Sequence, residues 1–465
     1  VKPTRDFSKP ETYELRSAGS ATVFKYLNQH SFSHSSANMS FERELDFKVG
    51  NGFFRRLWVS APASTKSTDG LGPLFNARSC QHCHLKDGRG HTPLGNWPVD
   101  DAVSMFLRLS IPPQNEKQRS LIDKHRLKVI PEPTYGGQLQ DLSIQGYEGE
   151  GKMKIEYQEF PVNFSDGTIV LLRKPNYFIV DWKYGLPHPE LQISPRIAPP
   201  MIGLGMLEAI SQKDILANAD PEDTNNDGIS GKANQVWDIK DNEVSLGRFG
   251  WKAGEPNIRQ QSAKAFNVDI GISTPLVNTP WGDCSSKQQK CRQALHGSTS
   301  GQNRFEISSE AMDKLVFYSR NLGVPARRDI NAPQVLAGKK LFYDIGCADC
   351  HRPKFVTKRL ADRPEQSFQL IWPYTDLLLH DMGERLADNR PEGLATGKEW
   401  RTAPLWGIGL TKTVNGHTQF LHDGRARNLM EAILWHGGEA EPAKQKVLKF
   451  NSQKREALLV FLNSL

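Results

Sequence analysis

The chain has 465 residues, which is enough for two or three domains with sizeable hydrophobic cores. Hydrophobic residues make up 38% and charged residues 24%, as in ordinary soluble proteins, and no apolar run approaches the ~18 residues of a membrane span. The formal charge of +7 is spread along the chain, so nucleic-acid binding is not indicated. Polar sequence follows Val1 at once, and we expect no signal peptide and a mature N-terminus.

The first motif with a clear chemistry follows a polar N-terminal region and a glycine-rich stretch. It is Cys80-Gln81-His82-Cys83-His84, a C-x-x-C-H pattern. Two cysteines at this spacing can form thioether bonds to the two vinyl groups of a haem, while the adjacent histidine binds the iron. We therefore predict haem attachment at Cys80 and Cys83, with His84 as an iron ligand.

A change of pattern marks residues 151–182, where KMKIEYQEF and TIVLLRKPNYFIVDW alternate apolar and polar side chains. Asp166-Gly167 lies between the two runs, and alternation around such a turn is typical of a β-hairpin. We expect a small β insertion in an otherwise helical domain, followed by a helix over residues 201–219.

The next segment has the beginning of a calcium-binding loop. Asp223, Asn225 and Asp227 alternate before Gly228, as in the first half of an EF-hand loop. Alternate oxygen side chains in a tight turn can converge on one hard cation. Asn234 stands where the acidic twelfth ligand would be, so an Asn/Asp-rich turn remains the alternative to a Ca²⁺ site.

Only two cysteines lie outside the C-x-x-C-H motifs, Cys284 and Cys291 in DCSSKQQKC. Thioether attachment of haem takes place outside the bacterial cytoplasm, where a local disulfide also persists. We therefore expect a periplasmic protein with a Cys284–Cys291 disulfide. The alternative is a pair of unpaired thiols in a surface loop.

A second C-x-x-C-H, Cys347-Ala348-Asp349-Cys350-His351, decides how the first is interpreted. One such pattern is expected by chance on the order of 0.002 times in a chain of this composition. A thioredoxin-like site would follow a strand in a βαβ unit, and a shared zinc site would not require the extra histidines. We predict two covalently bound haem c groups, the second attached at Cys347 and Cys350 with His351 as its iron ligand.

The two motifs divide the chain into two similar units. An amphipathic helix is expected over 309–322, residues 323–329 have the composition of a linker, and 452–465 has the pattern of a closing helix. We predict a mainly α fold of two cytochrome c-like domains. Residues 1–325 would hold haem 1, the β insertion and the possible calcium loop, and residues 326–465 would hold haem 2.

Sequence spacing alone does not choose the sixth iron ligands. A histidine or methionine in a chain of this size is more often structural than a ligand. The candidates are His91, His188, His296, His380, His417, His422, His436, Met201, Met206 and Met382.

Several longer segments carry a family resemblance. They are DGLGPLFNARSCQHCH, SPRIAPPMIGLGMLEAI, DGISGKAN, GRFGWKAGEPNIRQQSAKAF, EWRTAPLWGIGL and FLHDGRARNLMEAILWHGGEA. Through them the chain resembles the di-haem c-type oxidoreductase family, often labelled thiol oxidoreductases. This family is related to bacterial di-haem cytochrome c peroxidases and to the di-haem enzyme that matures tryptophan tryptophylquinone.

The resemblance implies a sixth ligand for haem 2. In the related peroxidases, a block of the form [FY]-H-[DST]-G precedes the distal ligand of the C-terminal haem. Here the block contains His422, and the matching ligand position, fourteen residues further, is His436. The implied pair is His351 with His436, which favours ferric iron more than a His/Met pair does. Met382 remains the alternative.

For haem 1, the resemblance implies that His188, which precedes an Ala-Pro pair, caps the iron in a resting state. A turn histidine is the alternative. Trp251 matches the tryptophan between the two haems, with core packing as the alternative, and Gln261 matches the distal glutamine. The position of the catalytic glutamate is Gly271 here. Proton transfer would therefore fall to the nearest carboxylate, Asp269, with Glu208 in the segment MLEAI as another candidate.

Together these features predict a periplasmic, peroxidase-like di-haem oxidoreductase. Haem 1 would react with a small oxidant such as hydrogen peroxide, and haem 2 would relay electrons from a small redox donor protein or cytochrome through Trp251. Two alternatives remain, a non-catalytic di-haem electron-transfer protein and an oxidase of a protein or thiol substrate. For the latter, Cys284 and Cys291 would be the only candidate thiols.

Overall fold

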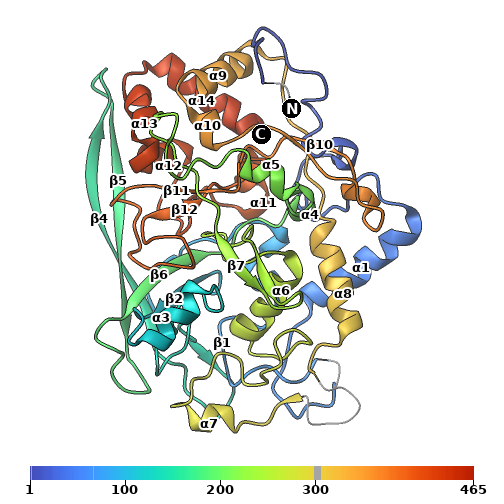
Figure 1. The fold of residues 1–465 in the computed structure, drawn as a ribbon, viewed down its shortest axis with the longest axis vertical. Coiled ribbons are helices and arrows are strands. Elements are labelled where there is room, and N and C mark those ends of the chain that lie inside the picture. Colours follow the sequence, from blue (N-terminus) through green and yellow to red (C-terminus); the bar gives the residue numbers. More distant parts are fainter. Residues whose placement is uncertain (2, 66–67, 298–304) are drawn as a thin grey trace.

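The computed structural model describes residues 1, 3–65, 68–297 and 305–465 (Figure 1). The α-helices of this part are α1 (Phe41–Arg55), α2 (Cys80–Cys83), α3 (Glu116–Asp123), α4 (Leu204–Ala209), α5 (Gln212–Leu216), α6 (Ile258–Ala265), α7 (Gln289–Arg292), α8 (Ser309–Arg320), α9 (Pro333–Asp344), α10 (Cys347–Cys350), α11 (Thr411–Asn415), α12 (Leu429–Trp435), α13 (Glu441–Leu448) and α14 (Ser452–Ser464). One π-helical turn, η3 (Phe266–Ile270), extends α6. No helix in these ranges is long and apolar enough to cross a bilayer.

The strands pair two by two in antiparallel sheets. They are β1 (Leu74–Phe75), β2 (Met105–Ser110), β3 (Leu142–Ser143), β4 (Lys152–Asn163), β5 (Ile169–Val180), β6 (Gln192–Ile197), β7 (Gln235–Asp238), β8 (Glu243–Leu246), β9 (Phe355–Val356), β10 (Leu370–Ile371), β11 (Leu379–Asp381) and β12 (Glu399–Arg401). The pairs are β1–β3, β2–β6, β4–β5, β7–β8, β9–β10 and β11–β12.

The predicted mainly α fold is correct only in part. Helices account for 29% and strands for 17% of the structure, so much of the chain is irregular. The 38 glycines and 29 prolines interrupt regular elements, and side-chain hydrogen bonds support the connections. The helix expected over 201–219 breaks into α4 and α5, because Ile210 is extended and Ser211 caps α5.

Other elements form as predicted. The β insertion is the β4–β5 hairpin, whose strands pair over twelve residues each, and it runs as a long ribbon along one edge of the molecule (Figure 1). The amphipathic segments near 309–322 and 452–465 form α8 and α14.

Two hydrophobic cores hold the chain together. The first lies around α1, α4, α6 and α8 and includes Phe54, Trp58, Phe266, Leu315 and Tyr318. The second joins α9, α12 and α14 to strands β2 and β5, so the hairpin packs on the C-terminal helices. Its contact between Phe160 on β4 and Trp435 on α12 has a ring separation of 5.5 Å. The domain boundary at 325/326 stays a prediction, and the second core contains residues from both sides of it.

The close contact between α9 and α14 depends on a glycine. A Cβ atom on Gly338 would lie 1.9 Å from the carbonyl oxygen of Ala457. We expect Gly338→Ala to lower the free energy of unfolding by about 1–3 kcal/mol through overpacking. Denaturant unfolding of the haem-loaded protein, followed by circular dichroism, measures this.

The control for this change is Gly52→Ala in α1, where an added Cβ meets no atom within 4 Å. It should be neutral or stabilise by up to about 1 kcal/mol, because alanine favours a helix. Equal effects of the two changes would contradict the packing explanation.

Candidate functional site

Each C-x-x-C-H motif lies on the wall of a separate cavity. The N-terminal cavity, of about 330 Å³, is lined by Cys80, Cys83 and His84. The C-terminal cavity, of about 290 Å³, is lined by Cys347, Cys350 and His351. The cysteines belong to the single-turn helices α2 and α10, and the histidines cap these helices. All four cysteines are free thiols, as thioether formation requires.

The two motif histidines are held in the same way. His84 Nδ1 lies 2.8 Å from the carbonyl oxygen of Pro199, and His351 Nδ1 lies 2.9 Å from that of Tyr374. A carbonyl oxygen only accepts, so each Nδ1 carries the proton and each Nε2 keeps its lone pair. Burial lowers the pKa of both imidazoles to about 4, so both are neutral at physiological pH, as metal binding requires.

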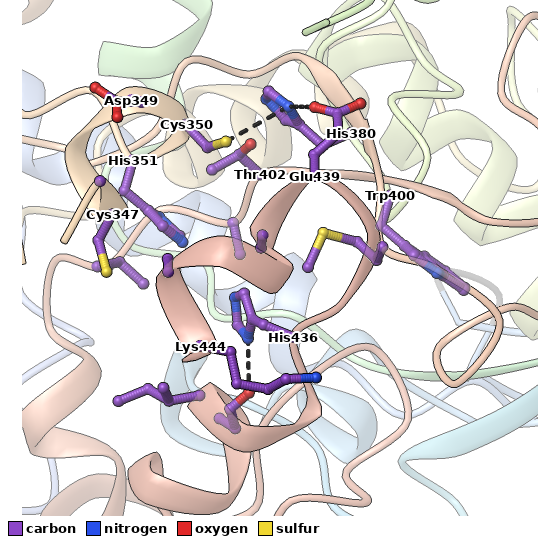
Figure 2. A pocket seen from close by; sticks show the side chains of 18 of the residues that line it. Cys347, Asp349, Cys350, His351, His380, Trp400, Thr402, His436, Glu439 and Lys444 are labelled. Carbon is purple, nitrogen blue, oxygen red and sulfur yellow. Dashed lines mark hydrogen bonds and ion pairs between the residues drawn. The ribbon is translucent and has the colours of Figure 1, made fainter. Parts of the chain in front are cut away.

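A second histidine enters the C-terminal cavity from the end of α12. Figure 2 shows the imidazoles of His351 and His436 directed into the same space from different elements. His436 Nδ1 donates to the carbonyl oxygen of Ala432 at 2.7 Å, which leaves its Nε2 free in the same way. Met382 lines this cavity as well. Both candidates for the sixth ligand of haem 2, His436 and Met382, thus line the C-terminal cavity.

Two other histidines line the C-terminal cavity, and only His380 has both ring nitrogens bonded, whereas His422 Nε2 has no hydrogen-bond partner. His380 is bonded through Nε2 to Asp376 at 2.9 Å and through Nδ1 to Glu439 at 2.6 Å. His422 stacks on Trp400 with a ring separation of 3.6 Å. His436 therefore differs from them in having one nitrogen held and the other unbonded.

The N-terminal cavity brings together Trp251, Gln261 and Asp269. Asp269 lies on the π-turn η3, a feature that often occurs at functional sites. Its Oδ1 accepts a hydrogen bond from Gln138 Nε2 at 2.9 Å, and burial raises its pKa. A raised pKa makes a carboxyl a better candidate for holding a proton than an exposed aspartate.

Glu208 and His188 lie elsewhere. Glu208 accepts bonds from Arg320 and Arg363, both at 2.6 Å, and these outweigh burial and lower its pKa. It does not line the cavity and has a structural role here. His188 lies in a turn outside both cavities, where its Nδ1 accepts a bond from the N–H of Glu190 at 3.1 Å.

Trp251 stands between the two cavities and lines both. The side chain is buried, and its Nε1 donates to the carbonyl oxygen of Ile197 at 2.8 Å, which fixes the ring. Arg89, Arg401, Ala403 and Pro404 also line both cavities, and we call these five residues the shared wall.

The shared wall fits a cofactor that carries carboxylates. Arg89 and Arg401 are buried, and neither forms an ion pair in the described part of the chain. Their guanidinium groups donate only to the carbonyl oxygens of Leu421, Gly250 and Thr402. Burial lowers the pKa of both to about 10, yet both stay charged.

An uncompensated buried cation is costly, so this wall is complementary to anions. A haem carries two propionate carboxylates, and its vinyl groups lie on the opposite side of the ring. Each cavity thus has its own pair of cysteines and shares the two arginines with the other cavity. The residues present therefore fit a haem in each cavity. The motifs in the sequence contain no signal for these two arginines.

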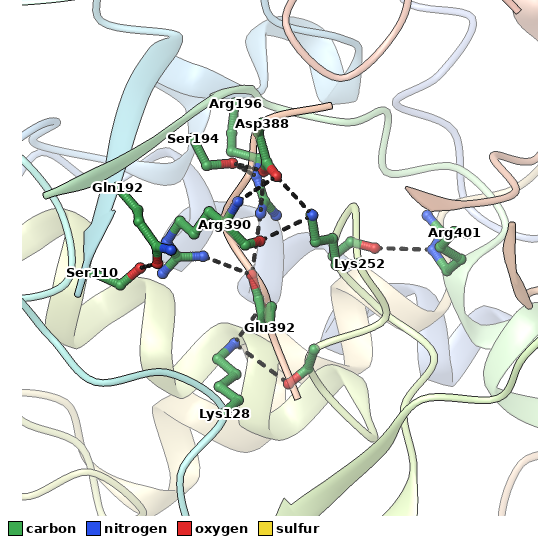
Figure 3. Close-up of polar contacts among 12 residues, drawn as sticks. Ser110, Lys128, Gln192, Ser194, Arg196, Lys252, Asp388, Arg390, Glu392 and Arg401 are labelled. Atoms are coloured by element: carbon green, nitrogen blue, oxygen red, sulfur yellow. Dashed lines mark hydrogen bonds and ion pairs between the residues drawn. The ribbon is translucent and has the colours of Figure 1, made fainter. Parts of the chain in front are cut away.

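A buried ionic network borders the N-terminal cavity (Figure 3). Lys252 Nζ, with no exposed surface, donates to Asp388 Oδ1 at 2.8 Å and to the carbonyl oxygen of Thr396 at 2.7 Å. Glu392 accepts from Arg196 and Arg390, both at 3.1 Å, and also pairs with Lys128 at 3.0 Å. These bonds fix residues 388–396 against the segment that carries Trp251. The sequence motifs did not indicate this network, because its partners lie far apart in the chain.

The calcium-like loop is closed by its own backbone. Asp223 Oδ1 and Asn225 Oδ1 accept from the N–H of Asp227 at 3.0 and 2.9 Å, and Asp227 Oδ1 accepts from that of Ile229 at 2.9 Å. Within the ranges described, no group of three or more His, Cys, Asp or Glu side chains is arranged to hold a metal ion. The Ca²⁺ site therefore stays a prediction.

Cys284 and Cys291 form the expected disulfide, and both are buried. In this state neither is a free thiol.

Comparisons with known proteins agree with the cavity geometry. The profile of the family described as "di-haem oxidoreductase, putative peroxidase" matches residues 12–465. No curated protein matches the chain. Among solved structures, hydrazine synthase of Kuenenia stuttgartiensis, studied under xenon pressure, is 14% identical over 77% of this chain and 90% of that chain. Its TM-score of 0.26 is too low to carry an argument. Because the family profile spans both motifs, both cavities and the shared wall, the chain belongs to the di-haem oxidoreductase family.

Proposed function

We propose that this di-haem oxidoreductase is a periplasmic, peroxidase-like enzyme with covalently attached haem c in both cavities. Haem 1, in the N-terminal cavity, reacts with a small oxidant such as hydrogen peroxide. Haem 2, in the C-terminal cavity, relays electrons from a small redox donor protein or cytochrome. The Cys284–Cys291 disulfide and the two thioether motifs support an oxidising compartment.

The observation that carries the proposal is the asymmetry of the cavities. The C-terminal cavity has His436 in addition to the motif histidine, and each of these two imidazoles has its Nδ1 held by a carbonyl oxygen and its Nε2 left for an iron. In the described residues, His84 is the only histidine on the wall of the N-terminal cavity. Met201 lines that cavity too, two residues after Pro199, whose carbonyl oxygen holds His84. In this proposal the iron of haem 2 would have two imidazole ligands and the iron of haem 1 would have one.

The haem in the N-terminal cavity would supply an open iron position for the oxidant. The residues of the chain do the rest. His84 Nε2 would bind the iron, Gln261 provides an amide that can orient a polar ligand, and Asp269 can hold or release a proton. Trp251, which lines both cavities, would place an aromatic ring between the two haems.

The proposal is tested by electron paramagnetic resonance of the half-reduced protein and by its reaction with hydrogen peroxide. We expect a high-spin signal from haem 1 and consumption of peroxide with electrons from a small cytochrome. If both haems stay low-spin and peroxide is not consumed, the chain is an electron-transfer protein instead.

The ligand role of His436 has a spectroscopic test. We expect His436→Ala to convert haem 2 alone from low to high spin, because the cavity then offers one imidazole instead of two. Met382→Leu is the matched control and should leave both spectra unchanged. The reverse pattern would assign Met382 as the ligand.

The position of Trp251 predicts slower electron transfer between the haems when its ring is reduced. We expect Trp251→Phe to slow this step several-fold in stopped-flow experiments, with the spectra of both haems retained. Trp406 lines only the N-terminal cavity, so Trp406→Phe is the matched control. Equal rates in the two variants would make Trp251 a packing residue.

A further inference from the structure

The disulfide loop places a second carboxylate in the N-terminal cavity. Asp283 immediately precedes Cys284, which is bonded to Cys291, and it lines the cavity beside Asp269. Its Oδ2 accepts hydrogen bonds from the backbone N–H groups of Gly137 and Gln138 at 2.7 and 3.0 Å. The carboxylate is therefore held firmly from one side.

The close contact between Asp283 and the turn at residues 136–137 depends on a glycine. Gly136 has φ of +75°, and a Cβ atom there would lie 2.7 Å from Asp283 Oδ2 and 2.6 Å from the Asp283 carbonyl oxygen. Any other residue would push the loop away from the turn. The turn at 136–137 and the disulfide loop thus fit together around this one side chain.

Gln138 connects Asp283 to Asp269. Gln138 is fully buried; its backbone N–H binds Asp283 Oδ2, and its side-chain Nε2 binds Asp269 Oδ1 at 2.9 Å. Each carboxylate has one oxygen held by Gln138. Asp283 Oδ1 and Asp269 Oδ2 make no hydrogen bond in the described part of the structure. Both residues line the cavity, so these are the oxygens available to a reactant.

The charges around the pair favour retention of a proton. Burial raises the pKa of Asp283 to about 6, with Asp269 adding to the increase and Arg108 opposing it. Arg108 lies on β2 and lines the cavity, and its charge also opposes the rise in the pKa of Asp269. Glu150 is the other acidic group that interacts with Asp283. Two cavity carboxylates thus share one guanidinium.

We propose that Asp283 is a second proton-exchanging carboxylate of the N-terminal cavity, coupled to Asp269 through Gln138 and positioned by the Cys284–Cys291 disulfide loop. It deepens the proposed function and rests on it for the identity of the oxidant. Reduction of one hydrogen peroxide to two waters breaks the O–O bond and consumes two electrons and two protons. The two electrons would come from the redox donor protein of the proposed function. The two carboxylates, each with one free oxygen, supply the two protons and regain them from solvent.

The test is redox-difference infrared spectroscopy of the haem-loaded protein, combined with peroxide kinetics. We expect Asp283→Asn to remove a protonated-carboxyl band and to lower kcat for peroxide on the order of 10²-fold, the low end of general acid–base catalysis, with KM little changed. Asp283→Glu should restore a band and part of kcat. Asp241→Asn, at an exposed position, is the matched control and should change neither. A difference spectrum of Asp283→Asn identical to that of the control would overturn the proposal.

Two further variants test the coupling and the loop. Asp269→Asn should shift the remaining carboxyl band, because it removes the neighbouring charge; no shift would reject the pair even if Asp283→Asn did not fold. The double change Cys284→Ala/Cys291→Ala should lower kcat as Asp283→Asn does while the haem spectra are retained, and an unchanged kcat would reject the role of the disulfide. If the infrared bands respond as expected but the wild type does not consume peroxide, the peroxidase function fails and the carboxylate pair stands.

Discussion

The uncompensated charge of Arg89 and Arg401 constrains the whole centre of the molecule. Both guanidinium groups are buried in the shared wall, and each is bonded only to backbone carbonyl oxygens. Arg248 is also buried and bonded only to backbone carbonyl oxygens, whereas Lys252 is paired with Asp388 and Arg327 with Glu14. What sets Arg89 and Arg401 apart is their place on the wall of both cavities. In the proposed function the haem propionates would supply the anions that these two arginines lack, so haem binding would stabilise the folded chain.

The paired charges of Figure 3 have a different role. These side chains connect residues 388–396 to the segment of Trp251, and Lys252 Nζ donates hydrogen bonds to Asp388 and to the carbonyl oxygen of Thr396. A buried network of this kind fixes one relative placement of two segments better than apolar contacts alone, because each displaced partner leaves an unsatisfied charge. The position of the Trp251 ring between the cavities depends on this placement, since Lys252 is its neighbour in the chain.

What could be predicted from the sequence was local. A C-x-x-C-H motif has its chemistry within five residues, and the alternation of β4 and β5 and the apolar face of α14 are visible in short windows. His436, Gln261 and Asp269 came from resemblance, and all three line the expected cavities. Glu208 does not line a cavity, because it is bonded to Arg320 and Arg363. The sequence did not indicate these ion pairs, since both arginines are distant from Glu208 in the chain.

The residues that were missed share one property. Arg89, Arg401 and Asp283 receive their roles from segments far away in the chain, and each is an ordinary surface-type residue when judged by its neighbours in sequence. The irregular share of the fold was missed for the same reason, because loops rich in glycine and proline are fixed here by distant side chains. A cavity wall is a long-range property that short patterns do not encode.

The exchange of residues across the predicted domain boundary bears on function. Arg390, Glu392 and Trp406 from the C-terminal part line the N-terminal cavity, and Arg89 and Trp251 from the N-terminal part line the C-terminal cavity. Neither unit alone would build its own site. In the proposed function, a change of charge at one haem would act through the shared wall on groups that also face the other cavity. Such coupling suits an enzyme in which one centre collects electrons and the other uses them, because the state of the first can adjust the second without a movement of domains.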